Sequence, residues 1–143
     1  GNYAFTTLDP ELGVMENERK KITIADLPGI NEGASQGLGL GTKFLKHAYR
    51  TKFLLHLVDG TQTTQDALKS FDIIEKELAD FHLDFSHQKR WICITKTDLI
   101  DQKSLSELIL EFQTKYPSIA IYPISSISGD GLDILSEELF KQI

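Results

Sequence analysis

A chain of 143 residues, 41% of them hydrophobic and 25% charged, has the length and composition of one globular domain that can bury a core. Its formal net charge of −6 argues against non-specific binding to nucleic acid, because such binding relies on Lys and Arg neutralising phosphates. No apolar run approaches the roughly 20 residues that cross a bilayer, and Cys93 is the single cysteine. We therefore expect one domain over residues 1–143, in a reducing cytoplasm.

Five apolar runs predict β-strands, taken here in chain order. The first two, residues 12–15 and 22–25, flank a polar turn and are typical of a hairpin. The third, residues 53–58, is almost entirely apolar, which indicates a central strand covered on both faces. The last two runs, residues 91–94 and 119–122, are interpreted in the same way.

Amphipathic stretches between these runs predict helices. Thr63 with Asp66, and Ser104 with Glu107, have the spacing of residues that cap the start of a helix, and apolar residues at helical spacing follow each pair. A third amphipathic stripe runs over residues 132–143. Alternating strands and helices imply a largely parallel sheet with helices on its faces. Such sheets bind ligands at the carboxyl ends of their strands, so we expect the loops there to form the site.

Two segments could hold phosphates and a metal ion. Asp26-Leu27-Pro28-Gly29 leaves the second strand, so that the Asp26 carboxylate can hold Mg²⁺ and the Gly29 N–H can meet a terminal phosphate. In Phe5-Thr6-Thr7-Leu8, the Thr7 hydroxyl can ligate Mg²⁺ while its N–H touches the same phosphate. Taken alone, neither pattern separates a site from an ordinary turn.

Two further segments could recognise a base. In Thr95-Lys96-Thr97-Asp98, the Asp98 carboxylate can accept both the ring N–H and the amino group of guanine, and it would reject adenine. The apolar stem of Lys96 can lie over the base while its ammonium stays in water. Backbone N–H groups of Ser125-Ser126-Ile127 could donate to the guanine carbonyl oxygen. A solvated turn and a plain helix start are the alternative interpretations.

The order of these four segments is more specific than any one of them, since Ras-like GTPases have their switch, metal and base-recognition loops in this order. The chain resembles the Obg family in particular, and the similarity covers essentially all of it. The most specific stretch runs from residue 26 to residue 59, through Asp26 to Ala34, the glycines of residues 37–41, and Phe44-Leu45-Lys46-His47. This resemblance implies an α/β, Ras-like P-loop GTPase domain, with a mostly parallel sheet and helices on both faces.

The resemblance also implies a function. The intact protein would bind GTP or GDP with Mg²⁺, hydrolyse GTP slowly as a switch, and contact the large ribosomal subunit during its assembly, as a bacterial, cytoplasmic monomer. Thr7 and Asp26 would hold the metal. We assign no catalytic residue, because Ile30 stands where Ras-like enzymes have a water-orienting Gln and an apolar side chain cannot align water. Thr95 replaces the Asn of most relatives.

One expected motif is missing from the sequence. The phosphate-binding string Gly-x-x-x-x-Gly-Lys-Ser/Thr does not occur, and residues 37–43 match it only superficially. We therefore expect a G domain that is incomplete at its amino terminus, as a piece of a longer protein. The alternative is a non-enzymatic interaction module on a GTPase-like scaffold that no longer binds nucleotide, although a retained Asp98 argues against it. An unrelated flavodoxin-like domain would leave the match over residues 26–59 unexplained.

Overall fold

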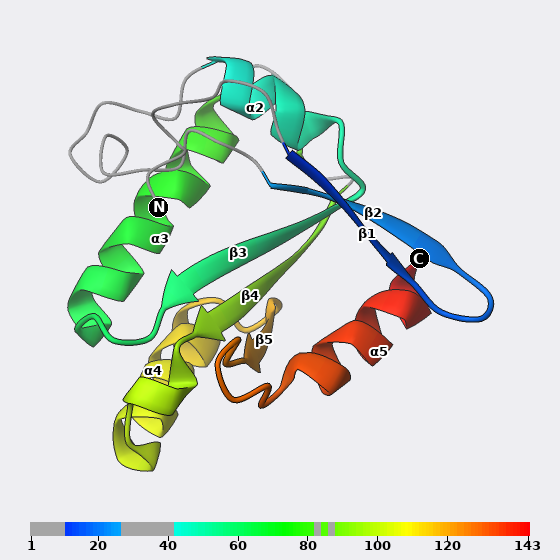
Figure 1. Ribbon diagram of the computed structural model, residues 1–143. Coiled ribbons are helices and arrows are strands. Elements are labelled where there is room, and N and C mark those ends of the chain that lie inside the picture. Colours follow the sequence, from blue (N-terminus) through cyan, green and yellow to red (C-terminus); the bar gives the residue numbers. More distant parts are fainter. Residues whose placement is uncertain (1–10, 27–41, 82–83, 86–87) are drawn as a thin grey trace.

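The computed structural model describes residues 11–26, 42–81, 84–85 and 88–143, and Figure 1 shows how their elements are arranged. In chain order the strands and helices are β1 (Glu11–Glu16), β2 (Lys21–Asp26), α2 (Thr42–Tyr49), β3 (Phe53–Asp59), α3 (Thr64–Asp80), β4 (Lys89–Thr95), α4 (Gln102–Lys115), β5 (Ala120–Pro123) and α5 (Leu132–Gln142). A short 3-10 turn, Thr97–Leu99, lies between β4 and α4.

The predicted hairpin is confirmed. Strands β1 and β2 pair antiparallel, with Glu16 opposite Lys21 at the turn. The Asn17 side chain holds that turn, because its Oδ1 accepts hydrogen bonds from the backbone N–H groups of Arg19 and Lys20 at 2.9 and 2.7 Å. Ile22, on one face of the hairpin, is buried against α5 and β4.

Strands β3, β4 and β5 form a parallel sheet in the order β3-β4-β5. The interpretation of a central strand covered on both faces is confirmed for residues 91–94, since β4 is central. It is wrong in the described part of the chain for residues 53–58 and 119–122, since β3 and β5 are the edge strands there. Residues 91–94 of β4 are all buried, whereas Leu57 of β3 is 62% exposed. The cause is that the cluster around α5 reaches β3 only at Phe53 and Leu55.

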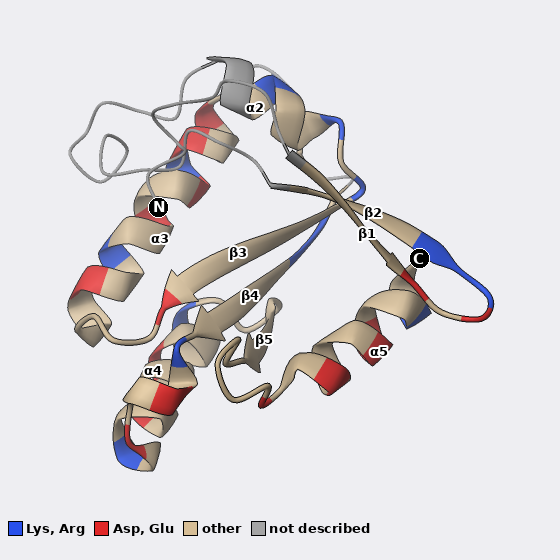
Figure 2. Ribbon diagram, viewed as in Figure 1, with Lys and Arg blue, Asp and Glu red and all other residues tan. Residues whose placement is uncertain are grey.

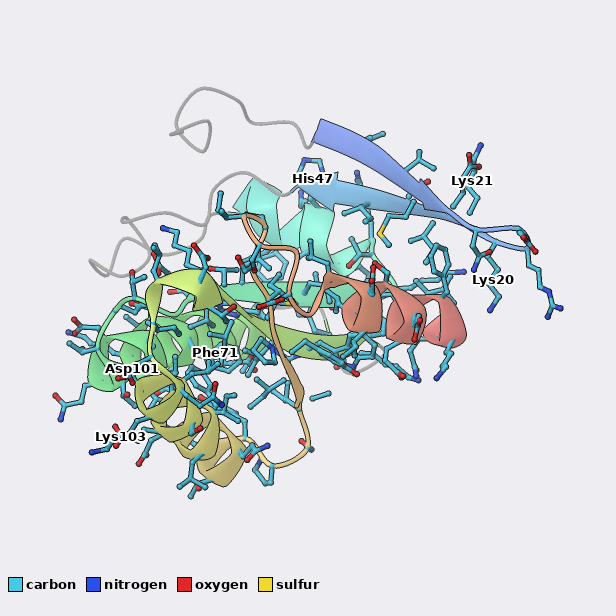
Figure 3. All side chains as sticks on the ribbon, turned by 60° about the horizontal axis from the view of Figure 1, so that its bottom comes forward. Lys20, Lys21, His47, Phe71, Asp101 and Lys103 are labelled. Atoms are coloured by element: carbon cyan, nitrogen blue, oxygen red, sulfur yellow. The ribbon has the colours of Figure 1, made fainter. Side chains whose placement is uncertain are left out.

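Helices cover both faces of this sheet, which confirms the predicted fold class. Helices α3 and α4 pack Phe71 and Phe112 against Ile92 and Ile94 on one face, and Figure 3 shows Phe71 in the interior. On the other face, α5 packs against Trp91 and Cys93, using leucines at helical spacing, Leu135 and Leu139.

Figure 2 shows charged residues along the helices and at the hairpin turn, while β3 carries none before Asp59 at its end. Between the layers, Arg90 of β4 pairs with Glu75 of α3, and the two side chains are 30% and 19% exposed. In the described residues, no helix is long and apolar enough to cross a membrane.

One of the two predicted helix caps is confirmed. Thr63 caps α3, and its side chain accepts a hydrogen bond from the Asp66 N–H at 3.1 Å. The predicted cap at Ser104 is wrong, because α4 begins at Gln102 and Ser104 lies inside its first turn. Asp101 caps it, accepting the Ser104 N–H at 2.7 Å, and Asp serves at this position as well as Ser does.

Candidate functional site

The carboxyl ends of β3, β4 and β5 lie at one edge of the sheet and are joined there by backbone hydrogen bonds. Asp59 is the register partner of Thr95, and Ile94 is that of Pro123. Beyond the strands, the Gly60 N–H donates to the Thr95 carbonyl at 3.0 Å, and the Ile124 N–H donates to the Ile94 carbonyl at 2.8 Å. The loops that follow the strands are therefore fixed relative to one another.

The loop after β4 contains the first predicted base-recognition segment, residues 95–98. Lys96 has the left-handed backbone conformation, with φ 61° and ψ 36°, and it is the one non-glycine residue with positive φ in the described ranges. The chain then makes a single 3-10 turn, and the Thr97 N–H donates to the Ile124 carbonyl at 3.3 Å. Asp98 lies in this turn, exposed to solvent.

The second predicted segment, residues 125–127, meets the first through a side-chain hydrogen bond. The Ser125 hydroxyl donates to Asp98 Oδ1 at 2.8 Å and accepts the Ser128 N–H at 3.0 Å. Ser125 itself is fully buried. The other carboxylate oxygen, Oδ2, has no partner in the part of the chain that the structure describes, so Asp98 is anchored through one oxygen and open through the other.

The backbone of the β5–α5 loop leaves two donors unused. The Ser125 N–H donates to the Asp130 carbonyl, and the Gly129 N–H donates to the Ser125 carbonyl, each at 2.9 Å. Between them, the N–H groups of Ser126 and Ile127 have no hydrogen-bond partner among the described residues. Both residues are exposed, Ile127 by 85%. Free donors and a free carboxylate oxygen thus occur together, in residues linked through Ser125.

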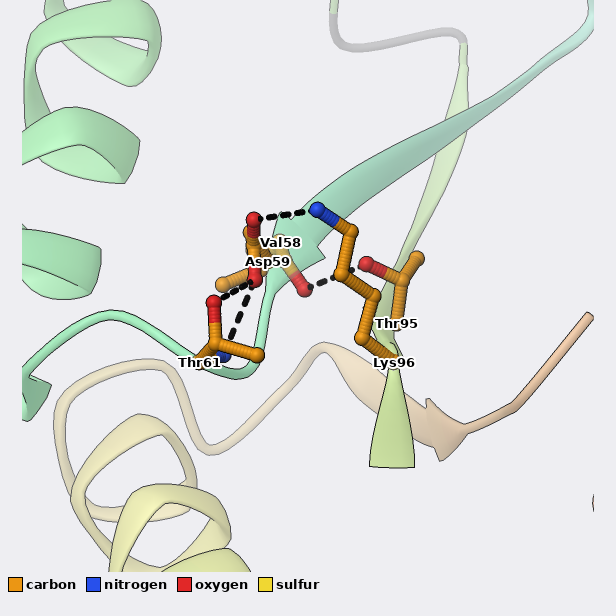
Figure 4. A network of polar contacts seen from close by, with 5 residues as sticks. All are labelled: Val58, Asp59, Thr61, Thr95 and Lys96. Carbon is orange, nitrogen blue, oxygen red and sulfur yellow. Dashed lines mark hydrogen bonds and ion pairs between the residues drawn. The ribbon is translucent and has the colours of Figure 1, made fainter. Parts of the chain in front are cut away.

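Lys96 is held at the end of β3, as Figure 4 shows. Its ammonium pairs with Asp59 Oδ2 at 2.9 Å. Oδ1 of the same carboxylate accepts the Thr61 N–H at 2.9 Å and the Thr61 hydroxyl at 2.6 Å. The hydrogen bond from the Thr61 hydroxyl is the main reason that the pKa of Asp59 is lowered. This carboxylate is therefore ionised at neutral pH.

Sequence reasoning missed Asp59 and Thr61. A signal was present, because Asp59-Gly60 directly follows an apolar strand at the same sheet edge. Gly60 is required at this point, since a Cβ there would lie 2.8 Å from the Thr95 carbonyl oxygen.

The predicted phosphate and metal segments are not tested by the structure. Phe5-Thr6-Thr7-Leu8 and Leu27-Pro28-Gly29 lie outside the described residues. Asp26 is described only as the last residue of β2, opposite Glu11. Within the described ranges, no group of three or more His, Cys, Asp or Glu gathers as a metal site. The Mg²⁺ site at Thr7 and Asp26 therefore stays a prediction.

Comparisons with known proteins show which family the chain resembles. The family described as 50S ribosome-binding GTPase matches residues 1–96. The chain is 42% identical to the GTPase Obg of Elusimicrobium minutum (strain Pei191), over 99% of this chain and 31% of that protein. It is 39% identical to the GTPase Obg of Desulfatibacillum aliphaticivorans, over 100% of this chain and 42% of that protein. The chain thus spans well under half the length of these curated relatives.

Solved structures share the fold at low identity. The structure of Era in complex with MgGDPNP and a segment of 16S ribosomal RNA matches with a TM-score of 0.72 and 24% identity, over 95% of this chain and 45% of that one. The elongation factor SelB from Methanococcus maripaludis, in complex with the GTP analogue GPPNHP, matches with a TM-score of 0.66 and 18% identity, over 96% of this chain and 28% of that one. The Ras-like GTPase fold expected from the sequence is thereby confirmed.

Proposed function

Because this chain belongs to the family of 50S ribosome-binding GTPases, with Obg proteins among its relatives, we propose that it forms the guanine-recognising part of an Obg-type GTP hydrolase. The observation that supports this function best is the pairing of Asp98 with Ser125, which joins two loops that are distant in sequence. A buried hydroxyl fixes one carboxylate oxygen, and the rest of the carboxylate faces solvent, where a ligand can reach it.

This arrangement has the chemistry to choose guanine. Asp98 accepts the ring N–H and the exocyclic amino group of guanine, which form a charge-assisted pair of hydrogen bonds. The free N–H groups of Ser126 and Ile127 donate to the guanine carbonyl oxygen. Adenine has neither the donor pair nor that carbonyl, so it would leave these groups unpaired, and unpaired polar groups at a binding site cost affinity. The stem of Lys96 covers one face of the base.

Residues 5–8 and 26–29 complete the proposal at the phosphate end. There Thr7 and Asp26 would hold Mg²⁺, which neutralises phosphate charge when it is bound. The Gly29 N–H would contact the terminal phosphate. Ile30 offers no group that could orient the attacking water, so we expect slow hydrolysis and a role as a switch.

The partner that we propose is the large ribosomal subunit, with GTP-dependent contact during its assembly in the bacterial cytoplasm and the protein acting as a monomer. The family description, 50S ribosome-binding GTPase, supports this partner. Since the net charge of this chain is −6, we expect contacts with ribosomal RNA to be local or to be made by other parts of the protein.

The test of this function is a change of base preference. In the full-length protein, Asp98→Asn should weaken GDP binding by about 100-fold, because charge-assisted hydrogen bonds are lost, and it should favour xanthosine diphosphate, whose base offers a carbonyl where guanine has its amino group. Titration with fluorescent GDP, competed by GTP, xanthosine diphosphate and ATP, measures both effects. Asp133→Asn on α5, which also removes one exposed carboxylate, is the matched control.

An unchanged base preference in Asp98→Asn would contradict the proposal. Absence of any GDP binding by the full-length wild type would instead favour the alternative, a non-enzymatic interaction module on a GTPase-like scaffold.

A further inference from the structure

Lys96 is held in an unfavourable backbone conformation at the site. The left-handed region is unfavourable for an L-residue with a side chain, because its Cβ crowds the following carbonyl oxygen. Glycine would remove that crowding, yet the position holds a long, charged residue. The Lys96 side chain is 55% exposed, so burial of its stem does not compensate. Strain of this kind at a ligand-binding edge indicates a functional demand on the side chain.

The contact of the Lys96 ammonium indicates what its side chain does. Asp59 Oδ2 lies 2.9 Å from Lys96 Nζ, so the lysine stem extends from the end of β4 toward the end of β3 (Figure 4). Asp98, two residues later, is tied in the opposite direction to Ser125, beyond the end of β5. The loop after β4 is therefore tethered on both sides.

Asp59 is itself fixed before it meets the lysine. Two hydrogen bonds from Thr61 occupy Oδ1 and turn Oδ2 toward the ammonium. The turn that contains Thr61 is locked to β4 by the Gly60 N–H, which donates to the Thr95 carbonyl at 3.0 Å. The anchor thus belongs to the rigid sheet edge and does not depend on a bound ligand.

Stability does not explain this arrangement. The side chains of Asp59 and Lys96 are 41% and 55% exposed, and ion pairs between such exposed groups contribute little to the free energy of unfolding. What the pair does supply is order in a side chain that has many rotamers.

We infer that Asp59, oriented by Thr61, is a positioning residue for guanine nucleotides, which keeps the Lys96 stem extended as a platform for the base before the nucleotide arrives. The inference rests on the proposed function, since it assigns Asp59 a task only if Lys96 meets a base. The contribution of Asp59 to affinity then acts through Lys96, and Asp59 makes no contact with the nucleotide.

The first experiment compares GDP affinities of full-length variants. Asp59→Asn keeps an acceptor for Thr61 and loses the charge that holds Lys96, so GDP binding should weaken about threefold to tenfold, the size expected when a flexible side chain is ordered only on binding. Thr61→Val should give a smaller loss in the same direction. Glu138→Gln, which breaks a separate exposed ion pair with Lys141, should leave GDP affinity at the wild-type value.

A double-mutant cycle separates positioning from a general structural effect. In a Lys96→Met background, Asp59→Asn should cause no further loss of GDP affinity, because the residue that it positions is gone. Equal losses in the two backgrounds would overturn the inference, as would wild-type affinity in Asp59→Asn. The base-preference test of Asp98→Asn distinguishes a failure of the positioning role of Asp59 from a failure of the proposed function. If that variant shifts to xanthine while Asp59→Asn binds GDP normally, only the positioning role fails. If Asp98→Asn keeps its guanine preference, the proposed function fails.

Discussion

His56 is a histidine that the fold keeps uncharged. It lies on β3 and packs against Phe71 of α3, with 4.4 Å between the ring centroids. Burial, and then the charge of Arg90, lower the pKa of His56 from 6.5 to about 4. Between these two pH values the unfolded chain binds a proton that the folded protein does not. The contribution of His56 is therefore fully present above pH 6.5 and is lost as the pH falls toward 4.

Replacing His56 by Phe should remove this pH dependence while keeping a ring against Phe71. For the wild type we expect a loss of about 2 kcal/mol in the free energy of unfolding between pH 7.5 and pH 5 from His56 alone, and the variant should lack this loss. Urea unfolding at the two pH values measures it. The comparison with the variant is needed because burial raises the pKa of Glu75, the ion-pair partner of Arg90, and this acts with the opposite sign. Equal pH dependence in both proteins would refute the role of His56.

Single residues also show which features of the site and fold could be predicted from the sequence. The cap at Thr63 was predictable, because a cap has a signature within a few neighbouring residues. The base-recognising role of Asp98 rests on a signature of the same kind and stays a prediction. Asp59 had a signal at the end of its strand, but its pairing with Lys96 was not predictable, since the two residues lie 37 positions apart and only the parallel register brings the strand ends together. Asp101 was missed for a different reason. Ser104 with Glu107 has the spacing of a capping box, and two competing caps within one turn cannot be ranked by spacing alone.

At the scale of elements, the junction between β5 and α5 depends on two glycines that differ in their surroundings. Gly129 and Gly131 both have positive φ, 85° and 80°. A Cβ at Gly131 would lie 2.1 Å from the Pro123 carbonyl oxygen, whereas a Cβ at Gly129 would meet nothing within 4 Å. Gly131 also caps the start of α5. The close approach of this helix to the end of β5 therefore requires glycine at position 131.

Alanine at these two positions should separate strain from steric exclusion. Gly129→Ala is expected to cost about 1–2 kcal/mol, the penalty of the left-handed conformation alone. Gly131→Ala should cost clearly more, because backbone must also move to admit the methyl group. It should also displace the loop that holds Ser125, so that GDP affinity falls in this variant and not in Gly129→Ala. Urea unfolding and GDP titration measure the two quantities, and equal effects of both substitutions would disprove the steric argument.

Across the whole molecule, the sequence predicted that the loops after β4 and β5 meet, but not how the strands are ordered. Parallel strands bring their carboxyl ends to one edge, which is why the segments around Asp98 and Ser125 could be expected together. The sequence misplaced β3 as a strand buried on both faces. An apolar strand is buried in this way only when helices pack on both of its faces. Leu57 has no such cover among the described residues, whereas four successive residues of β4 are buried between α3 and α4 on one face and α5 on the other.

This layering predicts that stability and recognition can be perturbed separately. Phe112 of α4 is fully buried and meets Phe71 edge to face, with 5.5 Å between ring centroids, on the face of β4 that α3 and α4 cover. Phe112→Ala should lower the free energy of unfolding by about 3–5 kcal/mol, through lost burial and the cavity left behind. Leu110→Ala, two residues away and 61% exposed, is the matched control and should change it by less than about 1 kcal/mol.

Urea unfolding measures both changes, and GDP titration of the folded fraction at low temperature adds the decisive comparison. Because Phe112 touches neither of the two loops proposed to recognise the base, the folded Phe112→Ala protein should bind GDP with wild-type affinity. Asp59→Asn should show the reverse pattern, with weakened binding and nearly unchanged stability. If Phe112→Ala weakened binding as much as Asp59→Asn does, the sheet edge would not be a preformed site. Its geometry would then depend on packing throughout the α3–α4 layer.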